Sequence, residues 1–265
     1  MRARRGRRLE TLRVLVTTYN EERNLERCLA SASFADEIWV VDSFSTDRTP
    51  ELARAAGARF VQRAYDSPSD QKNWALDQMP AGWVLILDAD ESVTAPLQAE
   101  IRATLAAPRH SAFWIPRRSW FLGKMIRHAG WDKDGVVRLL RQDAGRYECA
   151  LVHERMVCRG SVGRLRNYLE HRSYHGLADY LERMQRYAAS GGLQLHRRGV
   201  RAGADRVLAR PPARFLRMYF WQKGFLDGRH GFLLCVLTAL QIGLKHAIHW
   251  AYAKGLAEDP DERSR

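Results

Sequence analysis

Residues Trp83-Val84-Leu85-Ile86-Leu87-Asp88-Ala89-Asp90-Glu91 contain five consecutive apolar residues followed by three carboxylates. An apolar run of this length, bounded by polar residues, is typical of a strand that is buried on both faces. Two carboxylates one residue apart at the tip of such a strand can hold a hard divalent cation, because Mg²⁺ and Mn²⁺ prefer oxygen ligands. We therefore predict that Asp88 and Asp90 stand at the end of a buried strand and bind a metal ion.

Short apolar runs alternate with amphipathic stretches on both sides of this segment. The predicted strands are 12–17, 37–41, 59–62 and 83–87, and the predicted helices between them are 21–31, 48–56 and 70–78. Alternation at this spacing indicates βαβ units, and therefore an α/β fold with a mostly parallel sheet covered by helices on both faces. Ligands of such sheets bind beyond the carboxyl ends of the strands, so the functional site is expected there.

Two further strands of the predicted sheet run directly into polar residues. Strand 37–41 ends at Asp42, and strand 12–17 leads into Tyr19-Asn20-Glu21. An aromatic ring such as that of Tyr19 can stack on a nucleobase, and Asp42 can accept a hydrogen bond from a base or a ribose hydroxyl. The alternative is purely structural: Asp42 then serves as a turn or cap residue, and Tyr19-Asn20-Glu21 begins the following helix.

Four polar motifs recur in order along this part of the chain. They are Thr17-Thr18-Tyr19-Asn20-Glu21-Glu22, Val40-Val41-Asp42-Ser43-Phe44-Ser45-Thr46-Asp47, Gln71-Lys72-Asn73 and Leu87-Asp88-Ala89-Asp90-Glu91. Their order and spacing resemble those of family 2 glycosyltransferases, and most closely those of bacterial lipopolysaccharide-core β-1,4-glucosyltransferases. Further segments, including Gly130-Trp131 and Val152-His153-Glu154, extend the resemblance from about Leu12 to about Tyr252.

This resemblance implies a Rossmann-like GT-A fold and the transfer of a single hexose with inversion at its anomeric carbon. The implied donor is a nucleotide diphosphate sugar, with UDP-glucose first. The implied acceptor is a lipid-linked oligosaccharide, such as the inner core of lipopolysaccharide. The resemblance also implies a cytoplasmic enzyme at the inner face of the bacterial cytoplasmic membrane.

The resemblance also assigns roles to individual residues. It gives nucleoside binding to Thr17, Tyr19, Glu21 and Asp42, contact with the base or diphosphate to Lys72, contact with the ribose or the metal to Asp88, and coordination of Mg²⁺ or Mn²⁺ to Asp90. The sequence departs from the family at Phe44, where the family usually has glycine. A bulky side chain there is expected to change the loop beside the nucleotide.

Inverting transfer needs a carboxylate that takes the proton of the acceptor hydroxyl. The family usually keeps this base downstream of the metal carboxylates. Glu154 and Asp134 are equal candidates, and Asp132 is the third. For each of them the alternative is a solvated acid that pairs with a nearby arginine.

The remaining chain divides by pattern into a basic tail 1–11, a catalytic domain 12–171 and a helical region 172–256, with a second tail 257–265. Within the catalytic domain, 12–110 is the expected nucleotide-binding half and 111–171 the acceptor half. The prolines at 211 and 212 are expected to break the chain before an apolar stretch. The most apolar run, 231–244, is shorter than the roughly 20 residues that span a bilayer. Its aromatic and basic neighbours favour helices that lie on an anionic membrane surface, with packing on the catalytic domain as the alternative.

Composition limits the function classes. The chain has 43 Lys and Arg against 30 Asp and Glu, a net charge of +13, which favours phosphate-bearing partners. The charge is spread along the chain and no nucleic-acid-binding motif occurs, so we expect no nucleic acid partner. The four cysteines form no Cys-x-x-Cys pair, which suits a reducing compartment. Arginine-rich 1–8 is followed by a polar stretch rather than an apolar run, which is not the pattern of a secretory signal peptide.

Two alternative functions compete with the glycosyltransferase hypothesis. A nucleotidyltransferase also uses a parallel sheet and a metal carboxylate pair, but usually has a glycine-rich basic loop after its first strand. Residues 18–22 here are acidic and contain no glycine. The other alternative is a catalytically silent, membrane-bound scaffold of the same fold, against which the intact Asp88 and Asp90 argue.

Overall fold

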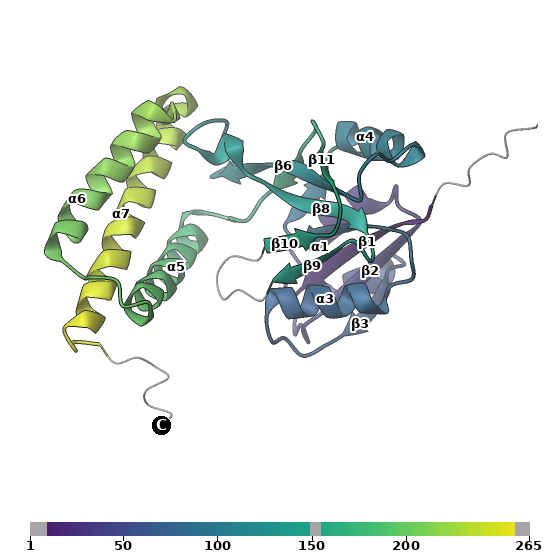
Figure 1. Cartoon of the computed structure of the whole chain (residues 1–265), viewed down its shortest axis with the longest axis horizontal. Helices are drawn as coiled ribbons and strands as arrows, with labels where there is room; N and C mark the ends of the chain where they lie inside the picture. Colours follow the sequence, from purple (N-terminus) through teal and green to yellow (C-terminus); the bar gives the residue numbers. More distant parts are fainter. Residues whose placement is uncertain (1–9, 149–154, 258–265) are drawn as a thin grey trace, which may run out of the picture. The chain divides into compact units, whose positions relative to one another are not determined.

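The computed structural model describes residues 10–148 and 155–257 of the chain (Figure 1). These residues form two compact units. The first, which we call the sheet unit, runs to residue 117 and includes 133–171. The second, the helical unit, comprises 118–132 and the residues from 172 onward. The predicted boundary after 171 coincides with the end of the sheet unit along the chain, whereas 118–132 groups with the helical unit.

The sheet unit is built on four parallel strands in the order β3-β2-β1-β4. They are β1 (Leu12–Thr18), β2 (Glu37–Asp42), β3 (Arg59–Gln62) and β4 (Trp83–Asp88). The sheet continues through β8 (Gly135–Arg141), which runs antiparallel to β4 and to β6 (Ala112–Phe121), and then through β12 (Leu169–His171) to β5 (Glu91–Val93). The α/β class with a mostly parallel sheet is confirmed.

The smaller strands extend the sheet or pair beside it. They are β7 (Lys124–Met125) and β11 (Val162–Arg164), which pair with β6, and β9 (Gly145–Glu148) with β10 (Arg155–Cys158), which form a separate ribbon. A single 3-10 turn, η1 (Trp131–Lys133), precedes β8.

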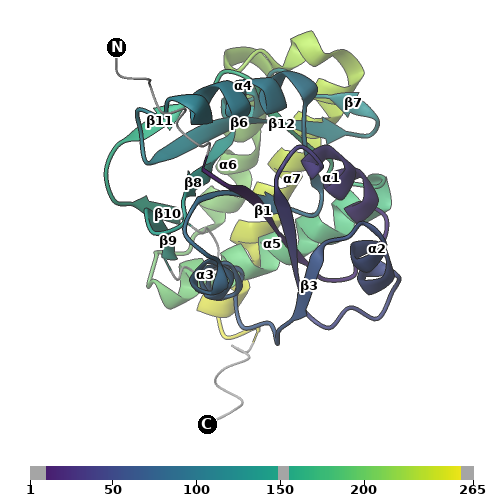
Figure 2. The same ribbon diagram turned by 90° about the vertical axis from the view of Figure 1, so that its right-hand side faces the viewer.

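Helices cover both faces of the parallel strands, as expected. They are α1 (Leu25–Ala32), α2 (Thr49–Ala55), α3 (Pro68–Gln78) and α4 (Ala95–Ala106). Along β1, Val14 and Val16 pack with α1, α2 and α4, while Leu15 packs with α3 on the opposite face. This alternation follows from the strand, because successive side chains point to opposite faces of a sheet. Figure 2 shows α3 on one side of β1 and the helices α1 and α2 on the other.

The helical unit contains three long helices, α5 (Leu177–Arg197), α6 (Ala204–Leu216) and α7 (Gly228–Ala253). A π-helical turn, η2 (Arg217–Trp221), and a 3-10 turn, η3 (Gly224–Asp227), connect α6 to α7. The buried carboxylate of Asp227 accepts hydrogen bonds from the backbone N–H groups of Arg127 and His128, at 3.2 and 2.8 Å. These bonds attach the 118–132 segment to the beginning of α7.

The prediction that Pro211 and Pro212 break the chain is wrong, because both lie inside α6. A proline within a helix removes a backbone donor and releases the carbonyl four residues earlier. No residue of α6 is fully buried, so water can reach the released carbonyls. Pro211 also packs against Gly243 of α7, where a Cβ atom would lie 3.1 Å from the Cγ of the proline. Packing against α7 therefore keeps the helix continuous.

The apolar helix is longer than the sequence pattern indicated. The helical segment Gly224–Ala253 is long and apolar enough to cross a membrane by length and composition, although the core helix of a soluble protein passes the same test. The predicted run of 231–244 ended at Lys245, but the helix continues past Lys245 and His246 because neither residue breaks a helix. Length alone therefore does not separate a spanning helix from one that packs or lies on a surface.

A close approach within the helical unit gives a test of its packing. A Cβ atom at Gly231 would lie 1.9 Å from the carbonyl oxygen of Gly224, so we expect Gly231→Ala to destabilise the unit by about 1–3 kcal/mol. Gly176 has open space around it and an extended backbone, so Gly176→Ala should change stability by less than about 0.5 kcal/mol. Chemical denaturation of the two variants measures the difference, and equal stabilities would contradict the described packing.

Candidate active site

The carboxyl ends of three adjacent strands meet at one edge of the sheet unit. In the strand register Thr18 lies opposite Asp42, and Thr17 lies opposite Asp88. The chain leaves β1 toward β2 and β3 on one side and reaches β4 on the other. Such a reversal of strand order opens a crevice at the strand ends, which is the usual ligand site of doubly wound sheets.

Asp42 is fully buried and its carboxylate accepts several hydrogen bonds. The donors are the Thr18 hydroxyl at 3.0 Å, the Gln62 amide at 3.1 Å, the backbone N–H of Ser45 at 2.9 Å and the Ser45 hydroxyl. Asp42 therefore shapes the loop that follows β2, as the structural alternative expected. Its role toward a nucleoside stays a prediction.

The loops after β1 and β2 are joined by hydrogen bonds between them. Backbone N–H groups at 20, 21 and 22 donate to side chains of the second loop, and an Asn20 oxygen accepts from the second loop in return. The bonds are Asn20 N to Ser45 Oγ (2.8 Å), Glu21 N to Thr49 Oγ1 (2.8 Å), Glu22 N to Asp47 Oδ2 (3.1 Å) and Thr46 N to Asn20 Oδ1 (2.9 Å). These hydrogen bonds hold residues 20–22 in the loop. The helix α1 therefore begins at Leu25 and not at residue 21, where it was predicted to begin.

Two exposed aromatic residues lie next to this joined pair of loops. Tyr19 is 60% exposed and Phe44 is 55% exposed. Phe44 has a φ of +59°, in the left-handed region that costs residues with a Cβ atom roughly 1–2 kcal/mol. This backbone conformation explains why glycine suits the position in the resembled family. The sequence pattern could not show that phenylalanine keeps the same backbone.

The backbone strain at Phe44 can be measured with two variants. Phe44→Ala and Phe44→Gly both remove the ring, but only glycine adopts a positive φ freely. After allowance for the greater freedom of glycine in the unfolded chain, Phe44→Gly should be more stable than Phe44→Ala by about 0.5–1 kcal/mol. The measurement is urea denaturation of both variants. A Phe44→Ala variant as stable as Phe44→Gly would show that the strain is absent.

Asp88, at the tip of β4, is held between two cations. Lys72 Nζ lies 3.0 Å from one carboxylate oxygen, and Arg138 of β8 bonds to the other. Lys72 is positioned by α3, whose first turn is capped by the Ser67 hydroxyl and carries Pro68 at its first position. Burial alone would raise the pKa of Asp88, but Arg138 and Lys72 hold it well below its usual range.

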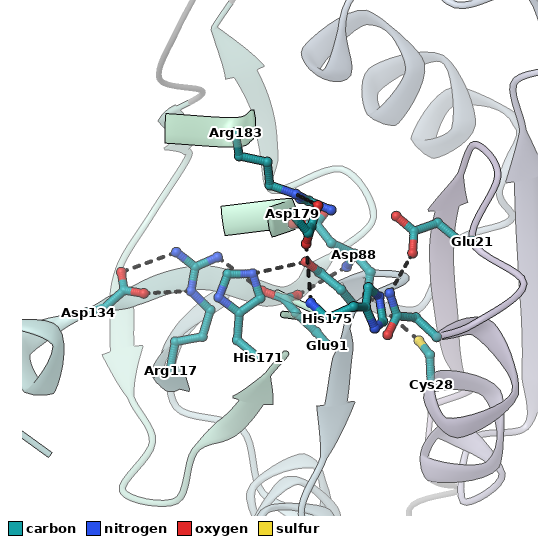
Figure 3. A network of polar contacts seen from close by, with 12 residues as sticks. Glu21, Cys28, Asp88, Glu91, Arg117, Asp134, His171, His175, Asp179 and Arg183 are labelled. Atoms are coloured by element: carbon teal, nitrogen blue, oxygen red, sulfur yellow. Dashed lines mark hydrogen bonds and ion pairs between the residues drawn. The ribbon is translucent and has the colours of Figure 1, made fainter. Parts of the chain in front are cut away.

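Glu91 is the first residue of β5, the next strand along the chain, and its side chain is fully buried. Its carboxylate accepts hydrogen bonds from Arg117 at 3.1 Å, from Arg138 at 3.4 Å and from the backbone N–H of Asp88 at 3.0 Å. Arg117 also forms a two-pronged pair with Asp134, at 2.8 and 3.2 Å (Figure 3). We call the set Lys72, Asp88, Glu91, Arg117, Asp134 and Arg138 the charge network.

The charge network contains three carboxylates and three cations, so its formal charge is balanced. Burial opposes the charged form of Arg117, but Glu91 and Asp134 raise its pKa; Asp88 and Glu91 do the same for Arg138. The predicted roles placed Lys72 at the base or diphosphate and Asp88 at the ribose or the metal, and no role was predicted for Arg117 or Arg138. Glu91 is a buried partner of both arginines.

Loss of the Glu91 charge should leave the buried guanidinium of Arg138 and the partly buried guanidinium of Arg117 without their shared partner. We therefore expect Glu91→Gln to destabilise the sheet unit by roughly 3–5 kcal/mol, the cost of breaking a buried ion pair. Glu51 forms an exposed pair with Arg48, so Glu51→Gln should cost less than about 1 kcal/mol. Denaturation midpoints of the two variants test this contrast, and a Glu91→Gln variant as stable as the wild type would refute the central role of Glu91.

Asp90, the second carboxylate of the motif, faces an imidazole. Its Oδ2 atom lies 3.3 Å from Nε2 of His171, the last residue of β12. Burial alone would lower the pKa of His171, but the hydrogen bond with Asp90 raises it. No sequence pattern indicated His171, because a strand of three residues shows no periodicity.

Asp90 and His171 are the side chains that could hold a divalent cation. Within residues 10–148 and 155–257, no group of three or more His, Cys, Asp or Glu side chains is arranged to hold a metal ion. Both oxygens of Asp88 face cations, whereas Asp90 and His171 converge on one another. One carboxylate and one imidazole can hold Mn²⁺ if phosphate oxygens and water complete the coordination, whereas Mg²⁺, which prefers oxygen ligands, would use the Asp90 carboxylate alone.

A cavity of about 630 Å³ opens beside the charge network within the sheet unit. Its charged part is formed by Lys72, Asp88, Arg117, Arg138 and Arg155. The remaining wall is largely apolar and aromatic, with Trp114, Tyr147, Met156 and Val162 among its residues. A cavity of this size and mixed character is typical of small-molecule sites.

The predicted candidates for the catalytic base are Asp134, Asp132 and Glu154. The Asp134 carboxylate belongs to the charge network, where both oxygens accept bonds from Arg117. Asp132 lies in the helical unit, and its backbone carbonyl accepts a hydrogen bond from Arg118. Glu154 lies outside the described residues.

The other predicted nucleoside residues lie on β1 and the loop that follows it. Thr17 is half-buried beside Asp88 in the strand register. Glu21 accepts a hydrogen bond from the Asn24 side chain at 2.8 Å, but α1 begins at Leu25, so Glu21 precedes the first turn of the helix instead of lying in it as the structural alternative expected.

Residues 13–171 match the family described as Glycosyl transferase family 2. The chain belongs to this family. Glycosyltransferase family 2 membership confirms the predicted resemblance, and the observed sheet agrees with the predicted GT-A fold.

Curated relatives align over most of this glycosyltransferase. Lipopolysaccharide core biosynthesis glycosyltransferase LpsC of Rhizobium meliloti (strain 1021) is 30% identical over 252 residues, covering 89% of this chain and 93% of LpsC. An uncharacterized glycosyltransferase of Rickettsia typhi is 23% identical and covers 87% of this chain and 84% of its own length.

Two solved structures are more distant. S. aureus TarS 1-349 in complex with UDP-GlcNAc has a TM-score of 0.49 and 14% identity, with 92% of each chain covered. Glucosyl-3-phosphoglycerate synthase from Mycobacterium tuberculosis, in complex with Mn²⁺ and UDP-glucose, has a TM-score of 0.35 and 23% identity, with 42% of this chain and 44% of the other covered.

Proposed function

We propose that this glycosyltransferase is a metal-dependent, inverting hexosyltransferase that transfers one glucose from UDP-glucose to a lipid-linked glycan such as the lipopolysaccharide inner core. The observation that carries the proposal is the charge network, which presents Lys72, Arg117 and Arg138 to a cavity at the strand ends. The relative LpsC, whose name places it in lipopolysaccharide core biosynthesis, supports the acceptor class.

In the proposed reaction the bond between the anomeric carbon and the diphosphate oxygen breaks while the acceptor oxygen bonds to that carbon from the opposite face. Lys72, Arg117 and Arg138 are already held by carboxylates, so they can stabilise charge on the departing diphosphate with little reorganisation. A divalent cation bound by Asp90 and His171 would add to this stabilisation as a Lewis acid. The acceptor proton passes to a carboxylate.

Asp134 and Glu154 remain equal candidates for that base, with Asp132 third. The pairing of Asp134 with Arg117 places its carboxylate next to the cavity, because Arg117 lines it. A substrate that engages Arg117 would release Asp134 to accept the proton. Acidic residues in this role contribute on the order of 10²–10⁴-fold to the rate.

The metal assignment predicts the effect of a single substitution. Asp90→Asn should lower the rate of UDP release from UDP-glucose and acceptor by about 100-fold or more, because a catalytic cation contributes several kcal/mol. Asp77, an exposed partner of Arg146, provides the matched control, and Asp77→Asn should retain activity. The assay quantifies UDP and pyrophosphate by chromatography. Full activity of Asp90→Asn refutes the metal assignment, and release of pyrophosphate instead of UDP indicates a nucleotidyltransferase.

We also propose that the helical unit attaches the enzyme peripherally to the inner face of the bacterial cytoplasmic membrane. Several large apolar side chains are exposed around η2, η3 and the start of α7, with Trp221 86% exposed. The others are Leu216, Phe220, Phe225, Leu226 and Phe232. Arg217, Lys223 and Arg229 lie among them in sequence. Aromatic and basic residues together are typical of surfaces that bind anionic membranes.

Vesicle flotation at low salt tests this attachment. Trp221→Ala combined with Phe220→Ala should weaken binding to anionic vesicles by about tenfold, because both side chains lose apolar burial. Tyr65, in the sheet unit, is comparably exposed to Phe220, and Tyr65→Ala should bind like the wild type. A wild-type protein that does not float with anionic vesicles would exclude the proposed attachment.

A further inference from the structure

Two histidines of α7 are buried, and several of their ring nitrogens make no hydrogen bond of normal geometry. His246 is 6% exposed and His249 is 1% exposed. Nδ1 of His246 and both ring nitrogens of His249 make no hydrogen bond of normal geometry. Buried polar atoms of this kind are uncommon in folded proteins and call for a bound water, an ion or a functional explanation.

The charged groups around these histidines are cationic or become so on protonation. Arg206 and Arg210 of α6 and Lys245 of α7 act on His246, and His196 of α5 acts on His249 together with Arg206 and Lys245. Lys245 is held against α5, where a Cβ atom at Gly191 would lie 3.1 Å from its Cδ. None of the groups that act most strongly on the two histidines is acidic.

The charged groups that act most strongly on the two histidines do not balance one another, whereas those of the charge network do. Burial and then the neighbouring cations lower the pKa of His246. Burial also lowers the pKa of His249, opposed in part by the backbone of Val200. Both rings are therefore neutral near pH 7, and each can donate one N–H. An anion is the missing counterpart, because it would accept from imidazole and guanidinium donors and offset the like charges.

We propose that Arg206, Arg210, Lys245, His246 and His249, which we call the α6–α7 cluster, form a binding site for a phosphate group. Guanidinium groups match phosphate geometry, and an imidazole adds a directed donor. The same two helices expose Leu208, at 75%, and Leu240, which provides apolar surface for the chains of a lipid. The phosphate of an anionic phospholipid headgroup is therefore the favoured source, and free phosphate is the other. The proposal does not depend on the transfer reaction proposed above.

The site should bind more tightly as pH falls. A bound anion stabilises the protonated imidazoles, so it raises the pKa of His246 and His249 above their values in the free protein. Binding is then linked to proton uptake, so the affinity for a phosphodiester, whose own charge does not change near neutral pH, increases as the pH falls.

Two titrations of the full-length protein test the proposal. The first measures the rise in melting temperature with inorganic phosphate, against chloride at equal ionic strength, at pH 6.5 and pH 8. The second measures flotation with phosphatidylglycerol vesicles against phosphatidylcholine vesicles. Arg210→Gln and His249→Gln are the test variants, and Arg186→Gln, an exposed arginine of α5, is the control. Arg210 is exposed, so its substitution should leave folding intact even where that of His249 does not.

The wild type should prefer phosphatidylglycerol, and Arg210→Gln should weaken that binding by about tenfold while Arg186→Gln does not, since a charged hydrogen bond is lost. A phosphate effect that is lost in Arg210→Gln and kept in Arg186→Gln identifies the phosphate group itself as the ligand. Phosphatidylglycerol binding that free phosphate does not inhibit assigns the site to the lipid headgroup. Equal binding by Arg210→Gln, Arg186→Gln and the wild type in both titrations overturns the proposal.

Discussion

The buried carboxylate of Glu91 is the constraint on which the rest of the site depends. It bonds to Arg117, Arg138 and the backbone of Asp88, and so connects β4, β5, β6 and β8 at one point. A buried charge without a partner is strongly destabilising, so these arginines and the carboxylate require one another. The consequence for function is that cationic groups stand at the strand ends in fixed positions before any ligand binds. Preorganised charge of this kind stabilises a departing diphosphate without reorganisation.

The part of the edge formed by the loops after β1 and β2 is organised by a different principle. Here short polar side chains rather than ion pairs hold the two loops after β1 and β2 together, with Asp42 buried beneath them. The loops adopt left-handed conformations at Asn20 and Phe44, which only a closely determined surrounding can maintain. The edge therefore combines a half whose carboxylates accept hydrogen bonds from hydroxyl, amide and backbone donors with a half whose carboxylates pair with cations.

The sequence predicted the parallel strands well, because β1, β2 and β4 are continuous apolar runs that end in polar residues. Each of these three strands extends only one residue beyond its prediction. Neither α4 nor the short strands β5 and β12 were predicted: α4 buries only Leu97 and Ile101, and three residues cannot show a period. The residues of the candidate site were predictable only where they belong to a local sequence motif. Asp42, Lys72, Asp88 and Asp90 belong to local motifs, whereas Arg117, Arg138 and His171 reach the site only through antiparallel pairing that no local pattern records.

The most direct test of the account is the position of Mn²⁺ in crystals of the protein soaked with UDP and MnCl₂. The anomalous scattering of manganese locates the ion independently of any assumption about ligands. If Asp90 and His171 hold the metal, one peak is expected in contact with the Asp90 carboxylate and the His171 imidazole, with the diphosphate oxygens on its other side and Lys72 facing the diphosphate. Ordered UDP with no manganese peak at Asp90, or a peak bound elsewhere on the chain, would contradict it.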